Sequence, residues 1–310
     1  MDQDQRDALL ALLKYLKTEG YGFVTPTPAT HARVIARKDG LAKNLRDVLG
    51  WSLPFSDDVL APAIRDMLAA GGALQPAGDL YRSSVRVSSL KDRLFLHSAY
   101  PTVEETAVFF GPDSYRFATL IEAEMTSQPS RPGMRLFDMG TGSGVGAIIA
   151  AGCAPADARI LASDINPKAI DFARINAAAA GVHIDARIGS GMAGAEDMMD
   201  VIFMNPPYIL DPRGRLYRDG GGPYGAGVTI AMAAAAVARL AKGGRAIIYS
   251  GSAIADGTDH LHAALADLCR QAGCTLHYRE LDPDVFGEEL ENPCYAGVDR
   301  IAVIAATMAR

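Results

Sequence analysis

The sequence predicts a two-part α/β protein. The larger part is a doubly wound, mostly parallel sheet of seven strands with an antiparallel hairpin at one edge, and a smaller α+β domain precedes it. Three observations predict this class. Short apolar runs alternate with helical patterns beyond residue 133, as in a parallel sheet covered by helices. A glycine-rich and a proline-rich segment each follow one of those runs. Before residue 98 the order differs, because helical patterns come first and a strand pattern follows.

The composition is that of an ordinary globular protein with room for two domains. The chain has 310 residues, of which 49% are hydrophobic and 21% are charged. Its net charge of −6 argues against binding of polyanions by the whole surface. Only the segment 31–46 is locally basic, with five Lys or Arg residues and one Asp. We interpret it as a solvated helix face, with a nucleic-acid contact as the alternative.

Cysteine usage and the apolar pattern predict a cytoplasmic protein without a metal site. The four cysteines form no C-x-x-C pair and lie in no histidine cluster, so neither a zinc site nor a disulfide framework is expected. The polar start, Met1 to Gln5, is no secretory signal. The longest apolar stretch, 226–241, is too short for a membrane span. We expect no membrane partner, and the sequence leaves the oligomeric state open.

The first domain, residues 1–98, is predicted to contain helices followed by a hairpin. Helical patterns are expected over residues 8–17, 29–38, 44–49 and 58–70. Apolar and polar residues then alternate between Leu74 and His97, which predicts a β-hairpin. Helices followed by a hairpin are compatible with a winged-helix-like module, and we expect this domain to recognise the substrate. A connecting helical region, 99–132, follows.

The second domain, residues 133–310, carries the sheet. Strands are predicted over 135–137, 159–162, 183–188, 201–204, 245–249, 275–281 and 300–306. Helical patterns lie between most of them, over 145–151, 167–180, 228–241 and 260–272. The last two strands follow each other without a helix, which predicts the antiparallel hairpin at the edge.

A glycine-rich turn ends the first strand of this sheet and begins a helix. It contains Gly140, Gly142 and Gly144. A side chain at Gly142 would collide with a ligand on the turn, and glycine also permits positive φ. The N-terminus of the following helix offers free N–H groups and a partial positive charge, which can receive a carboxylate or a phosphate. The turn therefore predicts a nucleotide-cofactor site.

Two carboxylates bear on which cofactor binds there. The glycine spacing fits a dinucleotide pattern, so NAD is a rival to S-adenosylmethionine (SAM). Asp138 precedes the glycines, where it would repel a pyrophosphate but could bind an ammonium group; a turn or capping carboxylate is the alternative. Asp164, at the tip of the second strand, suits a ribose diol or else caps the helix beginning at Pro167. Its neighbour Ile165 would pack against adenine.

The most informative stretch is Asn205-Pro206-Pro207-Tyr208, which follows an apolar run. Two prolines fix φ twice and remove two N–H groups, so the strand ends and carbonyl groups stay free. An amide or arylamine nitrogen has a delocalised lone pair and is a poor nucleophile. The Asn205 side-chain oxygen and the Pro206 backbone oxygen could hold its N–H groups, and Tyr208 could lie against the planar group. An ordinary Pro-Pro turn is the alternative. Together with the glycine turn, this stretch predicts methyl transfer from SAM to such a nitrogen.

Residues 100–306 resemble a class I SAM-dependent methyltransferase with an NPPY motif. Within that class they are similar to the protein-glutamine N5-methyltransferases that modify release factors, and to the small-domain RNA and DNA amino-methyltransferases. The resemblance implies that the residues holding SAM are Asp138, Gly140, Gly142, Gly144 and Asp164. It also implies that residues 205–208 present the target nitrogen. Asp113, just before a helical pattern, resembles a family position that lies against the cofactor, with a helix N-cap as the alternative.

The sequence departs from the family at two points. Family members commonly carry an acid after the third strand to meet the adenine amine, whereas this chain has Gly189-Ser190-Gly191, so Ser190 would supply a weaker contact. The first domain also does not match the all-helical substrate lobe of the release-factor enzymes. The identity of the substrate is therefore not inherited.

These patterns lead us to expect a SAM-dependent N-methyltransferase that acts on a planar amide or amine nitrogen. Our first choice of substrate is a protein glutamine side chain, which makes residues 133–310 the SAM-binding catalytic domain. The alternative is an exocyclic amine of RNA or DNA. An NAD(P)-dependent oxidoreductase and a SAM-binding scaffold that no longer transfers methyl groups are further alternatives.

Overall fold

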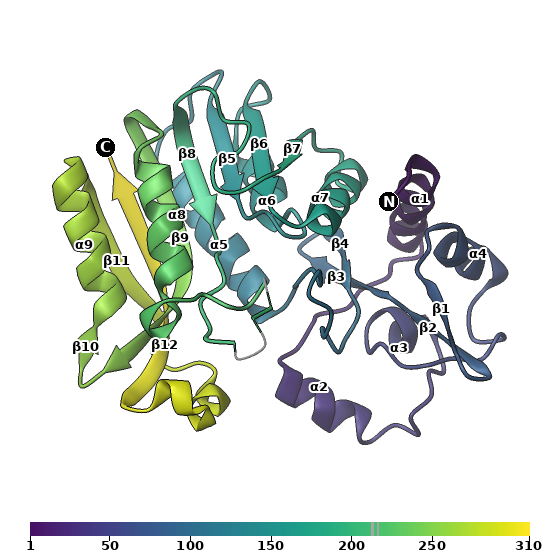
Figure 1. Cartoon of the computed structure of the whole chain (residues 1–310). Coiled ribbons are helices and arrows are strands. Elements are labelled where there is room, and N and C mark those ends of the chain that lie inside the picture. The colour runs from purple at the N-terminus through teal and green to yellow at the C-terminus, as the bar shows by residue number, and fades with distance from the viewer. Residues whose placement is uncertain (212–213, 216) are drawn as a thin grey trace.

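The computed structural model describes residues 1–211, 214–215 and 217–310 (Figure 1). Its main sheet, within these described residues, contains the seven predicted strands and one short addition. In spatial order the strands are β11 (Thr275–Asp282), β12 (Val298–Ala309), β9 (Leu240–Ala255), β8 (Met199–Met204), β5 (Arg135–Met139), β6 (Arg159–Asp164) and β7 (Asp185–Ile188), with β10 (Thr258–Asp259) beside β9. The strands from β9 to β7 are parallel, while β12 is antiparallel to both β9 and β11. The predicted fold class is confirmed, including the antiparallel pair at the edge.

Helices cover both faces of this sheet. One face carries α5 (Pro112–Thr126), α6 (Val145–Cys153) and α7 (Pro167–Ala179), and the other carries α8 (Gly227–Val237) and α9 (His260–Ala272). Successive strand residues point to opposite faces, so Phe203 packs in the core under α5 and α6 while Ile202 packs in the core under α8 and α9. Both faces are apolar, as in a buried parallel sheet. No helix in the described part of the chain is long and apolar enough to cross a membrane.

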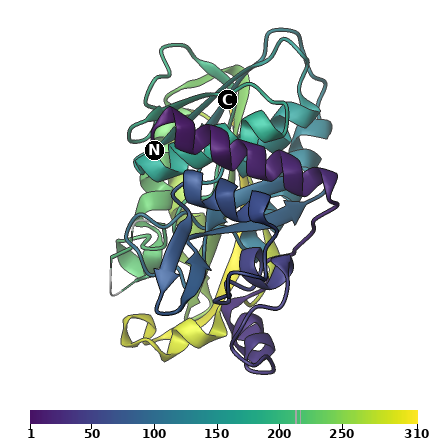
Figure 2. The same cartoon turned by 90° about the vertical axis from the view of Figure 1, so that its right-hand side faces the viewer.

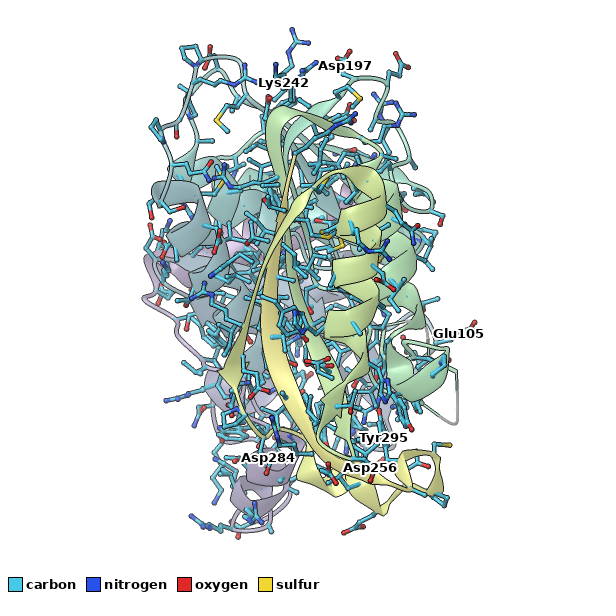
Figure 3. All side chains as sticks on the ribbon, turned by 90° about the vertical axis from the view of Figure 1, so that its left-hand side faces the viewer. Glu105, Asp197, Lys242, Asp256, Asp284 and Tyr295 are labelled. Atoms are coloured by element: carbon cyan, nitrogen blue, oxygen red, sulfur yellow. The ribbon has the colours of Figure 1, made fainter. Side chains whose placement is uncertain are left out.

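The order of the strands places a switch point beside β5. The chain runs from β5 to β6 and β7 on one side and then returns to lay β8 on the other side of β5. In open parallel sheets, ligands bind outside the carboxyl ends of the strands at such a point. Asp197 and Lys242, near the starts of β8 and β9, lie at one end of the molecule, and Tyr295 and Asp284 lie at the opposite end (Figure 3). The carboxyl ends of the parallel strands therefore face the end that carries Tyr295.

The N-terminal part contains helices and two hairpins where we predicted one. Its helices are α1 (Gln3–Thr18), α2 (Pro28–Ile35), α3 (Leu45–Leu49) and α4 (Pro62–Ala70). Its hairpins are β1 (Leu74–Ala77) with β2 (Leu80–Ser83), and β3 (Val85–Leu90) with β4 (Arg93–Ser98). The break lies at Ser83, whose hydroxyl bonds to both the N–H and the carbonyl group of Val85. Such local side-chain bonds compete with a strand ladder. The winged-helix-like arrangement stays a prediction.

The two parts share a packed interface. Helix α1 lies against α7 (Figure 2), and Phe172 of α7 belongs to the same apolar cluster as the leucines of α1. Asn176 of α7 accepts a hydrogen bond from the Leu96 N–H at 2.7 Å and donates one to the Leu96 carbonyl at 2.9 Å. The connecting region is helical only from Pro112, because residues 99–111 form no regular helix.

Candidate active site

The glycine turn and the NPPY turn leave neighbouring strands at the same level. Met139 at the end of β5 lies opposite Met204 at the end of β8, and it also lies opposite Ser163 of β6. Adjacent strands lie about 4.8 Å apart. The next residues, Gly140 and Asn205, therefore begin their turns side by side at the switch point. The two motifs, 65 positions apart in the sequence, therefore lie next to each other at this edge of the sheet.

The glycine turn has a conformation that only glycine adopts easily. Gly140, Gly142 and Gly144 have φ values of 71°, 55° and 83°. A Cβ atom added at Gly142 would meet no atom within 4 Å, so the space above this residue is open to a ligand. A Cβ atom at Gly144 would instead lie 3.1 Å from the Cα of Ala173, which shows that this glycine lets α6 approach α7 closely. Gly142 thus leaves space for a ligand, whereas Gly144 permits the close packing of two helices.

Asp138 supports the turn from below. Its side chain is 1% exposed, and its Oδ2 accepts hydrogen bonds from the Thr141 hydroxyl at 2.6 Å and from the Ala147 N–H in the first turn of α6 at 2.8 Å. Burial raises the pKa of Asp138 from 3.8 to about 7, while these two hydrogen bonds act in the opposite direction. The geometry corresponds to the turn-capping alternative. A contact with an ammonium group stays a prediction.

Asp164 braces the same turn from the neighbouring strand. Its carboxylate accepts hydrogen bonds from the N–H of Gly142 and from the N–H of Asn166, both at 2.9 Å. Burial raises its pKa. The cap of α7 is Asn166 and not Asp164, so the capping alternative for Asp164 is wrong. The neighbouring Ile165 is 51% exposed, which leaves an apolar surface next to the carboxylate.

Strand β7 adds Ile188, a residue that sequence reasoning missed, next to the predicted Ser190. Ser190 is exposed after the end of β7. Ile188, the last residue of β7, is 60% exposed and pairs with Asp164 across the parallel ladder. Single exposed apolar side chains are common, and Ile188 is of interest only for its place beside Asp164. Ile188 thus joins Ile165 as an exposed apolar residue next to Asp164, and a contact of either residue with adenine stays a prediction.

The NPPY turn contains acceptors that have no donor among the described residues. Pro206 is buried, while Asn205 and Pro207 are partly exposed. Among the described residues, none donates a hydrogen bond to the Asn205 side chain or to the Pro206 carbonyl group. Neither proline has an N–H group, so the turn offers oxygen acceptors and no donors at these two positions.

Tyr208 is buried, and its hydroxyl reaches the first turn of α5. It is 8% exposed, and its hydroxyl donates a hydrogen bond to Asp113 Oδ2 at 2.6 Å. Asp113 is itself buried in the first turn of α5, whose N-cap is Gly111, so the N-cap alternative for Asp113 is wrong. The other oxygen of Asp113 accepts a hydrogen bond from the Tyr249 hydroxyl at 2.7 Å. A role for Asp113 in binding the cofactor stays a prediction.

Three further residues hold the NPPY region, and sequence reasoning missed all of them. Tyr249 and Gly251 lie on β9, and Tyr295 accepts a hydrogen bond from the Leu210 N–H at 2.8 Å. The only sequence signal was Gly251, because a glycine inside a strand often marks a close approach. Among the described residues, no cluster of His, Cys, Asp or Glu is arranged to hold a metal ion.

Comparisons with known proteins show similarity to methyltransferases. Residues 113–253 match the family model described as the methyltransferase small domain. The chain is 33% identical over 172 residues to a release factor glutamine methyltransferase of Bordetella pertussis, an alignment that covers 50% of this chain and 58% of the relative. It is 32% identical over 199 residues to a release factor glutamine methyltransferase of Cereibacter sphaeroides, covering 60% of this chain and 65% of the relative. The chain thus spans less than two thirds of either relative.

A solved structure shares the fold. The crystal structure of WT Trm5b from Pyrococcus abyssi matches with a TM-score of 0.50 and 16% identity, over 80% of this chain and 68% of that chain. The predicted resemblance to SAM-dependent methyltransferases is confirmed, and with it SAM as the cofactor class.

Proposed function

We propose that this protein is a SAM-dependent N-methyltransferase that methylates a planar amide nitrogen, with a protein glutamine side chain as its substrate. One observation carries the proposal. The glycine turn and the Asn205-Pro206 acceptors leave adjacent parallel strands at the same register, at the switch point of the sheet. A cofactor held on one turn is therefore next to a group held on the other.

The residues at the edge fit SAM. The open space above Gly142, which a Cβ atom would fill, gives a ligand direct access to the backbone of the turn. We assign the ribose to Asp164, the adenine to Ile165 and the methionine end to the glycine turn and the beginning of α6. When bound, SAM supplies a methyl group on a positively charged sulfur.

The chain's own residues orient the acceptor. The Asn205 side-chain oxygen and the Pro206 carbonyl oxygen accept the two N–H groups of a primary amide and so fix the plane of the nitrogen. Its lone pair then points toward the neighbouring turn. No strong base is required, because the proton leaves once the nitrogen is cationic. Such alignment can supply about 7–11 kcal/mol of rate enhancement.

The choice of glutamine is supported by the relatives. Both relatives described above are named release factor glutamine methyltransferases, and their alignments cover 50% and 60% of this chain. A primary amide has two N–H groups for the two acceptors. The N-terminal part is then the region that selects the protein substrate.

One observation favours the alternative substrate, an exocyclic amine of RNA or DNA. Arg33 and Arg37 lie on and just after α2, are exposed, and form none of the ion pairs found in the described part of the chain. Unpaired arginines suit phosphate groups, and their binding should weaken steeply with salt. Negligible affinity for RNA and DNA at low salt would exclude this alternative.

Transfer of tritiated methyl groups from SAM into a cell extract tests the proposal. We expect the label in protein, with loss on protease treatment and not on nuclease treatment. Hydrolysis of the labelled protein should release N5-methylglutamine. Label that disappears with nuclease would favour the alternative, and no label in any fraction would contradict methyl transfer.

A further inference from the structure

The tyrosine of the NPPY turn is packed as a structural residue. Its ring lies directly on the backbone of β9, because a Cβ atom added at Gly251 would be 2.2 Å from the Cδ2 of Tyr208. Real Cβ contacts are never this short, so Gly251 lies directly against the Cδ2–Cε2 side of the ring. The ring of Phe286 lies 6.0 Å away at 59°, on a different segment of the chain. The ring is therefore enclosed and only 8% exposed.

A hydrogen-bond network centred on the buried Asp113 fixes the hydroxyl of the same tyrosine. Asp113 accepts from Tyr208 on one oxygen and from Tyr249 on the other. Arg116 donates to Asp113 at 3.2 Å and to Asp282 of β11 at 3.3 Å. The network thus links α5, the NPPY turn, β9 and β11. Charge-assisted hydrogen bonds of this kind are about twice as strong as neutral ones.

The protonation states match this network. Burial, followed by the nearby Asp113, raises the pKa of Tyr208 and that of Tyr249 far above the usual value for tyrosine. Both hydroxyls therefore remain protonated donors at neutral pH, and the Asp113 carboxylate accepts from each of them.

We infer that Tyr208 anchors the NPPY turn instead of stacking on the target group, and that Asp113, Tyr249 and Gly251 are positioning residues that act through it. A consequence, which rests on the proposed function, concerns the substrate. A nucleobase must leave its stack and is then held between aromatic or apolar surfaces. A primary amide needs only the two acceptors of the turn. An enclosed Tyr208 therefore selects an amide over a base.

Hydrogen exchange tests the anchor without any substrate. The Ile209 N–H bonds to the Arg218 carbonyl, and the Gly220 N–H bonds to the Ile209 carbonyl, so both amides report on the chain that follows the turn. In Tyr249→Phe and Asp113→Asn we expect both amides to exchange about tenfold faster, since a charge-assisted bond is lost. Unchanged exchange rates in both variants would overturn the inference that Tyr208 anchors the NPPY turn.

The chain offers a matched control for these variants. Tyr278 of β11 donates to Asp259 at 2.7 Å, in the same domain and with a similarly raised pKa, but it is not part of the Asp113 network. Tyr278→Phe should leave the exchange of Ile209 and Gly220 unchanged. Faster exchange in Tyr278→Phe as well would show that the whole domain is destabilised, and it would overturn a specific role of the Asp113 network in anchoring Tyr208.

Kinetics then separate anchoring from stacking. Tyr208→Phe keeps the aromatic ring and loses only the hydroxyl. Anchoring predicts that kcat for a glutamine peptide falls about tenfold, as in Tyr249→Phe, while the KM for SAM changes less than about twofold. Stacking predicts a normal kcat in Tyr208→Phe, and that result would overturn the inference.

The double variant and the choice of acceptor complete the test. Because Tyr208 and Tyr249 act through one carboxylate, Tyr208→Phe with Tyr249→Phe should lose less activity than the product of the two single effects. Transfer to an oligonucleotide and not to the glutamine peptide would overturn the substrate part. If the wild-type protein transferred no methyl group at all, the proposed function would fail, and the exchange experiment would still decide the anchor.

Discussion

The two turns of the active site are held in different ways. The glycine turn is held by local bonds, because Asp138 binds Thr141 and Ala147, three and nine residues further on, and Asp164 binds Gly142 from 22 residues away. The NPPY turn depends on a residue 95 positions earlier, Asp113. Local support can be recognised in the sequence, whereas distant support becomes visible only in the fold. We therefore expect damage to the two turns to affect binding and transfer separately.

The largest expected effect comes from Asn205→Ala. Loss of one positioned group that binds the reacting atoms lowers the rate by about 10²–10³-fold in comparable sites. The affinity for SAM should stay within a few-fold, since Asn205 belongs to the acceptor half. Single-turnover transfer and calorimetry with SAM measure the two quantities. Normal transfer by this variant would remove Asn205 from the mechanism.

A smaller loss of transfer is expected from Gly251→Ala. The new methyl group would collide with the Tyr208 ring and displace the turn. We expect kcat to fall by about tenfold or more, as for other losses of alignment, with an unchanged dissociation constant for SAM. Gly22→Ala is the matched control, because the nearest atom to its added Cβ lies 3.9 Å away and its φ is not positive. Equal kcat in both variants would show that β9 does not position Tyr208.

The opposite pattern is expected from Asp164→Ala. Loss of a charged hydrogen-bond partner should weaken SAM binding by about 1–3 kcal/mol. Saturating SAM should restore most of kcat, because the acceptor half is intact. Titration calorimetry and kinetics at several SAM concentrations measure this. Unchanged affinity would mean that Asp164 only braces the Gly142 N–H.

The last expected effect concerns the pH dependence of stability and not methyl transfer. The folded pKa of Asp138 is about 7, above its unfolded value of 3.8, so its protonated form stabilises the fold at low pH. This contribution is fully present below about pH 4 and is lost as the pH rises to about 7. Asp138→Asn remains neutral and should gain stability relative to the wild type across this window. Thermal unfolding from pH 4 to 8 measures the difference, and a difference that does not change with pH would contradict the raised pKa.

Much of the catalytic part could be predicted from the sequence. The seven strands, the edge hairpin and the two turns follow from apolar periodicity and from the special conformations of glycine and proline. These signals are local, so β8 ends at Met204 as predicted, while β5 and β6 each continue past their predicted ends, to Met139 and Asp164.

Long-range contacts could not be predicted in this way. Tyr249 looks like one more apolar residue of a buried strand, and only the fold shows its hydroxyl on Asp113. The predicted stacking role of Tyr208 could not anticipate that Gly251, 43 positions later, would lie directly against its ring. The single predicted hairpin before residue 98 is two hairpins, because the Ser83 hydroxyl interrupts the pattern by bonding to the backbone.

A crystal structure with bound S-adenosylhomocysteine is the most direct test of the central claim that one turn holds the donor and the other presents the acceptor. We predict that the ligand lies over Gly142, with its ribose at Asp164 and its sulfur facing the Asn205 side chain. A ligand bound elsewhere, or an Asn205 turned away from the sulfur, would contradict this claim.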